Sequence, residues 1–316
     1  MKYASTLAIF FLALVLPSLS QQWPHIIGTG PTSKPTLSPF GPVALTIKRE
    51  VQEVNLVLSV TDHRGHFVQG LSPSDLTIFD DDRKQTALTF FQSQTDLPLH
   101  VVLLLDMSAS ITGEFPQEQG TIQDFLRHAT RPADSVTLFA FNQRVQFVAP
   151  VINNWKDISR SVRRLKPDGE TALYDAVAEA SHFLAHDQTP ARRIIILISD
   201  GEENHSQATL DQTIAEVLKD EATIYTVNVL QNPPDDEGKQ GSQILQRLSD
   251  ATGGAYLRAN EDGGVGSAFS KIRRELRSQY AVAYKPSNLK DQIFHSLRII
   301  ASRNLRVRCR TGYFVK

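Results

Sequence analysis

Cysteine is almost absent from this sequence, because its 316 residues include only Cys309. A single thiol cannot form an internal disulfide or supply the cysteine ligands of a zinc finger or an iron–sulfur centre. An excess of charge of one sign is absent too, since 33 Lys and Arg residues stand against 34 Asp and Glu residues. The formal net charge of −1 argues against a protein that coats nucleic acid, because such binding depends on clustered positive charge. The hydrophobic fraction of 41% is sufficient for a folded core.

Long apolar runs are missing except at the N-terminus. There, Lys2 precedes the apolar residues 3–16, and small residues follow up to Ser20. This order is typical of a secretory signal peptide, and we expect cleavage after Ser20. The alternative, a membrane anchor, is disfavoured because the run is shorter than the roughly 20 apolar residues that span a bilayer. The sequence therefore predicts a secreted or periplasmic protein without a transmembrane segment in the mature chain.

Two segments of short strands are predicted on either side of a longer central region. Proline recurs through residues 21–42, which predicts an extended tether without regular hydrogen bonding. In residues 43–97, short apolar runs separated by turn residues predict strands at 43–47, 54–60, 76–79 and 88–91. Residues 279–316 predict strands at 279–284, 295–301 and 305–314. We expect both segments to form one small β-sandwich, with two separate small sheets as the alternative.

The last predicted strand alternates two kinds of side chain. Leu305, Val307 and Cys309 form one predicted face, which we expect to be buried. The opposite face would carry a stripe of arginines at 306, 308 and 310. This stripe could protect a sheet edge from aggregation or bind an anionic partner.

The central region, residues 98–278, alternates apolar strands with amphipathic helices. Residues 101–105 are a continuous apolar run, and the predicted strand at 193–199 is apolar throughout 194–198, as expected of central strands covered on both faces. Further strands are predicted at 135–141, 145–151, 223–230 and 255–257, and helices at 118–128, 157–165, 172–185, 208–219, 242–252 and 266–278. This alternation predicts an α/β fold with a doubly wound, mainly parallel open sheet.

Oxygen-bearing side chains are concentrated on three loops of this central region. Asp106, Ser108 and Ser110 directly follow the first apolar strand, Thr171 opens a predicted helix, and Asp200 ends the second apolar strand. Loops at the carboxyl ends of parallel strands converge at the switch point of an open sheet. Two carboxylates and three hydroxyls, without His or Cys, are a donor set that suits a hard divalent cation such as Mg²⁺.

These loops resemble the von Willebrand factor type A domain. The resemblance lies in Asp106-x-Ser108-x-Ser110, in Thr171 within Gly-Glu-Thr-Ala-Leu-Tyr-Asp-Ala, and in Asp200 within Ile-Ser-Asp-Gly. More narrowly, residues 43–316 resemble a family of exported bacterial proteins that is abundant in acidobacteria.

The resemblance implies a metal-ion-dependent adhesion site for Mg²⁺, with Mn²⁺ or Ca²⁺ as alternatives. Ser108, Ser110 and Thr171 would contact the metal, while Asp106 and Asp200 would bind it largely through water. A Glu or Asp carboxylate of a protein partner would complete the coordination. The expected rim of the partner site consists of Met107, Glu170 and Gly201.

Three functions are compatible with these features. The first is a non-enzymatic binding protein that captures an acidic group through the metal. A metal-assisted hydrolase with Asp200 or Glu202 as base is less favoured, because no Ser/His/Asp or Cys/His nucleophile pattern is recognisable. A structural scaffold of a cell-envelope complex is the third function.

A separate acidic turn, Asp80-Asp81-Asp82, raises the question of a second cation site. It has no Glu at the spacing of an EF-hand loop. We therefore interpret it as a solvated turn.

Overall fold

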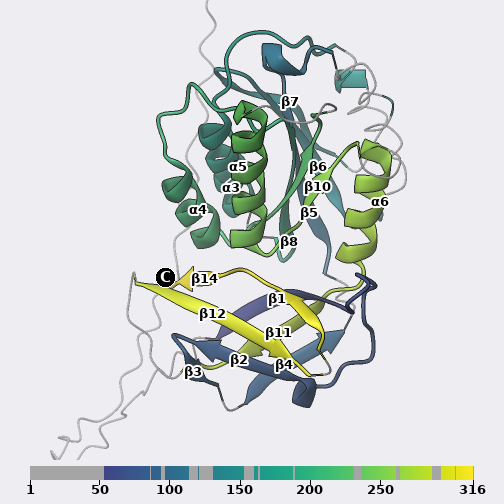
Figure 1. Ribbon diagram of the computed structural model, residues 1–316, viewed down its shortest axis with the longest axis vertical. Helices are drawn as coiled ribbons and strands as arrows, with labels where there is room; N and C mark the ends of the chain where they lie inside the picture. The colour runs from purple at the N-terminus through teal and green to yellow at the C-terminus, as the bar shows by residue number, and fades with distance from the viewer. Residues whose placement is uncertain are drawn as a thin grey trace, which may run out of the picture. The chain divides into compact units, whose positions relative to one another are not determined.

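Strands and helices alternate through the central region, as Figure 1 shows. The computed structural model describes residues 53–315, apart from residues 86, 94–96, 114–119, 121–130, 153–159, 163, 188, 231–235, 261–263, 287–292 and 303. The predicted signal peptide, the tether and the predicted strand at 43–47 lie outside the described residues. The same holds for the predicted helix at 118–128 except residue 120, and for residues 157–159 and 163 of the predicted helix at 157–165.

A six-stranded sheet organises this central region, with the strand order β10-β9-β8-β5-β6-β7. Its strands are β5 (Leu99–Asp106), β6 (Ser135–Phe141), β7 (Val145–Ile152), β8 (Arg192–Ser199), β9 (Thr223–Asn228) and β10 (Tyr256–Arg258). β7 is antiparallel to β6, and the other neighbouring pairs are parallel. The predicted fold class, a mainly parallel α/β sheet, is confirmed.

Helices cover both faces of this sheet. The helices are α3 (Leu173–His186), α4 (Leu210–Lys219), α5 (Asp236–Thr252) and α6 (Val265–Leu276). Alternate residues of β5 enter different cores: Val102 and Leu104 pack with α3, whereas Leu103 and Leu105 pack with α6. Every residue of β5 is buried as a result, which explains its uninterrupted apolar sequence. Among the described residues, no helix combines the length and apolar character needed to cross a membrane.

The strands before and after this region pair with each other in two four-stranded sheets, β13-β1-β11-β4 and β14-β12-β2-β3. Their strands are β1 (Val54–Thr61), β2 (Leu76–Asp80), β3 (Arg83–Lys84), β4 (Leu88–Ser93), β11 (Tyr280–Tyr284), β12 (Phe294–Ala301), β13 (Arg306–Arg308) and β14 (Gly312–Phe314). β1 is antiparallel to β11, and β2 is antiparallel to β12. Leu58 of β1, Ile78 of β2 and Tyr280 of β11 belong to one hydrophobic core, so the two sheets enclose a shared interior.

The predicted arginine stripe is only partly a surface feature. Arg306 is exposed. Arg308 instead pairs with Glu275 of α6, and Arg310 donates a hydrogen bond of 2.9 Å to the carbonyl oxygen of Asn55. The expected continuous exposed stripe is therefore wrong, because two of its three arginines have partners within the protein.

Candidate metal centre

Asp106 lies at the carboxyl end of β5, between the ends of β8 and β6. Its side chain is buried. One carboxylate oxygen accepts a hydrogen bond of 2.9 Å from the backbone amide of Ser108, and the other accepts one of 2.6 Å from the hydroxyl of Ser199. These two bonds fix the orientation of the carboxylate at the point where β5 ends.

The loop after β5 brings two serine hydroxyls together. The Oγ atoms of Ser108 and Ser110 lie 3.1 Å apart, with Ser108 buried and Ser110 exposed. A short 3₁₀ helix, η2 (Ala109–Ile111), turns the chain here. The alternate spacing of the three polar residues thus places Asp106 and both serines around one tight loop.

A second loop is bonded to the first through the backbone. The amide of Ala109 donates to the carbonyl of Gly169 over 3.0 Å, and the amide of Asp168 donates to the carbonyl of Met107 over 2.8 Å. Thr171 is buried just beyond these bonds, at the start of α3. The second loop therefore lies against the first.

Thr171 also connects this loop to the third. Its backbone amide donates to the side chain of Asn204 over 2.8 Å, and its carbonyl accepts a hydrogen bond from the backbone amide of Asn204. These hydrogen bonds attach Thr171 to Asn204 on the third loop. They do not involve Asp106, Ser108, Ser110 or Asp200, the other four predicted metal ligands.

Asp200 follows β8, on the neighbouring strand to Asp106. It is largely buried, and one of its carboxylate oxygens accepts a hydrogen bond of 3.0 Å from the amide of Glu202. Burial, followed by the negative charge of Asp200, raises the pKa of the Asp106 carboxyl to about 7. The charged form of Asp106 is therefore unfavourable in this buried site unless a cation lies beside it.

The three expected rim residues differ in their environments. Glu170 is exposed and forms an ion pair of 2.7 Å with His205. Met107 is 4% exposed and belongs to the hydrophobic core, and Gly201 is buried against the backbone of Gly241 in α5. The expectation that Met107 and Gly201 lie at an accessible rim is wrong, because both are covered by the protein.

Sequence reasoning missed Ser199 as a part of the site. Its hydroxyl donates to Asp106 and accepts a hydrogen bond of 2.9 Å from the amide of Gly201, so it joins the first and third loops. Its position at the end of an apolar strand, directly before Asp200, is the signal that could have identified it.

Comparison with known proteins agrees with this arrangement. The family model described as the von Willebrand factor type A domain matches residues 101–203. A von Willebrand factor type A structure from Catenulispora acidiphila superposes with a TM-score of 0.50 at 11% identity, covering 76% of this chain and 73% of that one.

Two further solved structures are less similar. A pilus adhesin from Lactobacillus rhamnosus in an open conformation gives a TM-score of 0.48 at 11% identity and covers 79% of this chain and 49% of its own. An aerotolerance-related membrane protein from Bacteroides fragilis gives a TM-score of 0.48 at 16% identity and covers 56% of this chain and 98% of its own. The matched residues run from within β5 through α3 and β8 to the start of the third loop, so residues 101–203 of this chain match a von Willebrand factor type A domain.

Proposed function

We propose that this protein is an exported, non-enzymatic binding protein that captures an acidic group of a protein partner through a bound Mg²⁺ ion. The observation that carries the proposal is the closeness of two buried carboxylates, Asp106 and Asp200, at adjacent strand ends. A carboxylate pair of this kind is costly without a cation.

The donor atoms around this pair fit a hard divalent cation. The hydroxyls of Ser108 and Ser110 lie beside Asp106, and all of these donors are oxygens, which Mg²⁺ prefers. Thr171 would add a third hydroxyl from the second loop. Bound Mg²⁺ would supply a positive centre that attracts a carboxylate oxygen.

The protein's own residues hold this site in shape. Ser199 fixes Asp106 through its hydroxyl, and the backbone bond from Ala109 to Gly169 keeps the first two loops together. Because the loops are bonded before any ligand arrives, little order has to be gained on binding.

Glu170 would influence the choice of partner. Its exposed carboxylate lies on the second loop, and His205 on the third loop pairs with it. An acidic partner would meet this negative charge, so His205 is expected to reduce the repulsion by holding the Glu170 side chain.

Export rests on residues 1–20 of the sequence, which have the order of a secretory signal. N-terminal sequencing of the protein from an export-competent host tests this part. The expected mature chain begins after Ser20.

The metal is tested by thermal unfolding of the metal-stripped full chain in EDTA and in millimolar Mg²⁺. We expect Mg²⁺ to raise the thermal midpoint of the wild type and of Glu170→Gln, but not that of Asp106→Ala. An equal rise in Asp106→Ala would contradict the metal assignment.

Partner capture is tested with a displayed peptide library selected in Mg²⁺ and in EDTA. We expect peptides selected in Mg²⁺ to contain Asp or Glu and to lose binding when that residue becomes Asn or Gln. Selection of the same peptides in EDTA would favour a scaffold role instead.

A further inference from the structure

The acidic turn after β2 is not simply solvated, because one of its members is buried beside a histidine. Asp80 is 5% exposed, whereas the side chain of Asp81 is 46% exposed. His295, in β12, is buried against both. Each of the three residues offers one potential ligand atom, and these three atoms all lie within 4.8 Å of one another.

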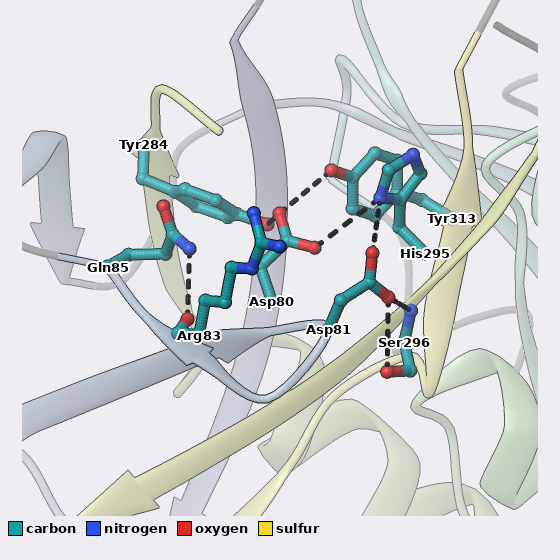
Figure 2. Close-up of polar contacts among 8 residues, drawn as sticks. All are labelled: Asp80, Asp81, Arg83, Gln85, Tyr284, His295, Ser296 and Tyr313. Atoms are coloured by element: carbon teal, nitrogen blue, oxygen red, sulfur yellow. Dashed lines mark hydrogen bonds and ion pairs between the residues drawn. The ribbon is translucent and has the colours of Figure 1, made fainter. Parts of the chain in front are cut away.

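The two carboxylates present one oxygen each to His295, as Figure 2 shows. The second oxygen of Asp80 accepts hydrogen bonds from the hydroxyls of Tyr284 and Tyr313, over 2.7 and 2.9 Å. The second oxygen of Asp81 accepts a hydrogen bond of 2.9 Å from the amide of Ser296. Each carboxylate is thereby held in place through one oxygen, while its other oxygen is directed at the histidine.

The inward oxygen of Asp80 has no hydrogen-bond partner although it is buried. Nδ1 of His295 lies 3.7 Å from this oxygen. That nitrogen lies 2.9 Å from the inward oxygen of Asp81. A buried carboxylate oxygen without a partner is costly, so its position points to a cation that belongs between these atoms.

We propose that Asp80, Asp81 and His295 bind a divalent transition-metal ion of the Zn²⁺ class. A set of one imidazole and two carboxylates suits Zn²⁺ better than Mg²⁺ or Ca²⁺, which prefer oxygen ligands alone. With bonds of about 2.0–2.2 Å, neighbouring ligand atoms of a tetrahedral Zn²⁺ lie about 3.3 Å apart. The two separations from Nδ1 of His295, 2.9 Å to Asp81 and 3.7 Å to Asp80, lie on either side of that distance.

The surroundings have the features of a supported metal site. Metal-binding carboxylates are typically hydrogen-bonded through their outer oxygens, as Tyr284, Tyr313 and Ser296 provide here. Because the Asp81 side chain is 46% exposed, a water molecule from solvent would supply the fourth ligand.

The ion would act as a structural cross-link. Asp81 and His295 are 214 residues apart in sequence. Asp81 directly follows β2 and His295 lies in β12, and these two strands pair only in the folded protein. Since one cysteine excludes an internal disulfide, a metal at this point would stabilise the pairing of the N-terminal and C-terminal strands in another way. This role is independent of the Mg²⁺ site proposed above.

Thermal unfolding of the metal-stripped full chain with Zn²⁺ tests the proposal. At a free Zn²⁺ concentration of about 100 times the dissociation constant, we expect the wild-type midpoint to rise by about 5 °C. The same rise is expected in Asp106→Asn, which keeps this cluster, and no rise in Asp81→Asn. Asp81 is the main variant because its partly exposed side chain can be replaced without disturbing the core.

Absorption of the Co²⁺-loaded protein gives a second readout that does not depend on folding stability. We expect visible ligand-field bands at one Co²⁺ per chain in the wild type and in Asp106→Asn, and their loss in Asp81→Asn and His295→Gln. Equal Zn²⁺ stabilisation of wild type and Asp81→Asn, or the absence of Zn²⁺ binding to the wild type, would overturn the proposal.

Discussion

The carboxylate of Glu275, near the end of α6, accepts a hydrogen bond of 2.7 Å from the hydroxyl of Ser59 in β1. The same carboxylate accepts a hydrogen bond of 3.0 Å from Tyr225 in β9 and pairs with Arg308 in β13. Glu275 is 4% exposed. A single buried acid therefore connects the last helix of the α/β region to two strands of the β-sandwich.

Replacing this acid should destabilise the protein strongly. We expect Glu275→Ala to lower the free energy of unfolding by about 3 kcal/mol, because it leaves the Arg308 guanidinium and the Tyr225 hydroxyl without their partner. Urea unfolding measures the change. Glu216→Ala is the matched control, since Glu216 forms an exposed pair with Lys219 and its loss should cost less than about 1 kcal/mol. If both variants lost a similar free energy of unfolding, the buried contacts of Glu275 would contribute no more to stability than an exposed ion pair.

Asp106→Asn should separate metal binding from stability. In EDTA, we expect this variant to be at least as stable as the wild type, because it removes the repulsion between Asp106 and Asp200 in a buried site. In Mg²⁺, the wild type should become the more stable of the two. Thermal midpoints in both solutions test this reversal, and a variant that is less stable in EDTA would show that the carboxylate pair is not strained without metal.

Gly201→Ala should disturb the third loop. Gly201 has a φ of 86°, and an added Cβ would lie 2.6 Å from the carbonyl carbon of Gly241 in α5. We expect a loss of at least about 3 kcal/mol, from the unfavourable φ together with the steric overlap. Gly65→Ala is the matched control, because its φ is 82° but nothing lies within 4 Å of an added Cβ, so about 1 kcal/mol is expected. Equal losses in chemical denaturation would assign the whole effect to φ.

Acidification should destabilise the protein through His100. Burial lowers the pKa of His100 below its ordinary value of 6.5; Arg193 lowers it further, while Asp187 acts in the opposite direction. The unfolded chain therefore takes up a proton at a higher pH than the folded chain. The resulting stability is present above pH 6.5 and is lost as the pH falls below it.

His100→Leu should therefore flatten the dependence of unfolding free energy on pH between about 7 and 5. Urea titrations at several pH values measure this slope. His63→Gln, at an exposed turn, controls for the loss of a histidine as such. An unchanged slope in His100→Leu would exclude His100 as its source.

The sequence predicted the elements of the central sheet well, because apolar runs such as those of β5 and β8 can arise only where both faces are covered. It also placed Asp106 and Asp200 at the carboxyl ends of two central strands, since parallel strands carry their following loops to one edge. The pairing of β5 with β8 makes these two strands neighbours. The burial of Met107 and Gly201 could not be predicted, because the path of a loop depends on contacts with distant backbone such as that of Gly241.

The Asp80, Asp81 and His295 cluster was missed for a related reason. Its acidic members form a local motif, but the histidine comes from β12 and reaches them only because β2 and β12 pair. Likewise, alternation within residues 305–310 predicted an exposed Arg308, and only the tertiary position of Glu275 explains its pairing.

The pairing of β1 with β11 and of β2 with β12 determines the order in which the sheets can fold during synthesis. The six strands of the central sheet all lie between Leu99 and Arg258, so that sheet can close while the C-terminal residues are still being made. The two outer sheets must wait, because Asp80 meets Tyr284 across 204 residues of intervening chain. Until Tyr280–Tyr284 and Phe294–Ala301 have been synthesised, β1 and β2 lack these partners and expose unpaired backbone groups to which strands of other molecules could bind. The nascent chain therefore depends on its C-terminal strands for protection from aggregation.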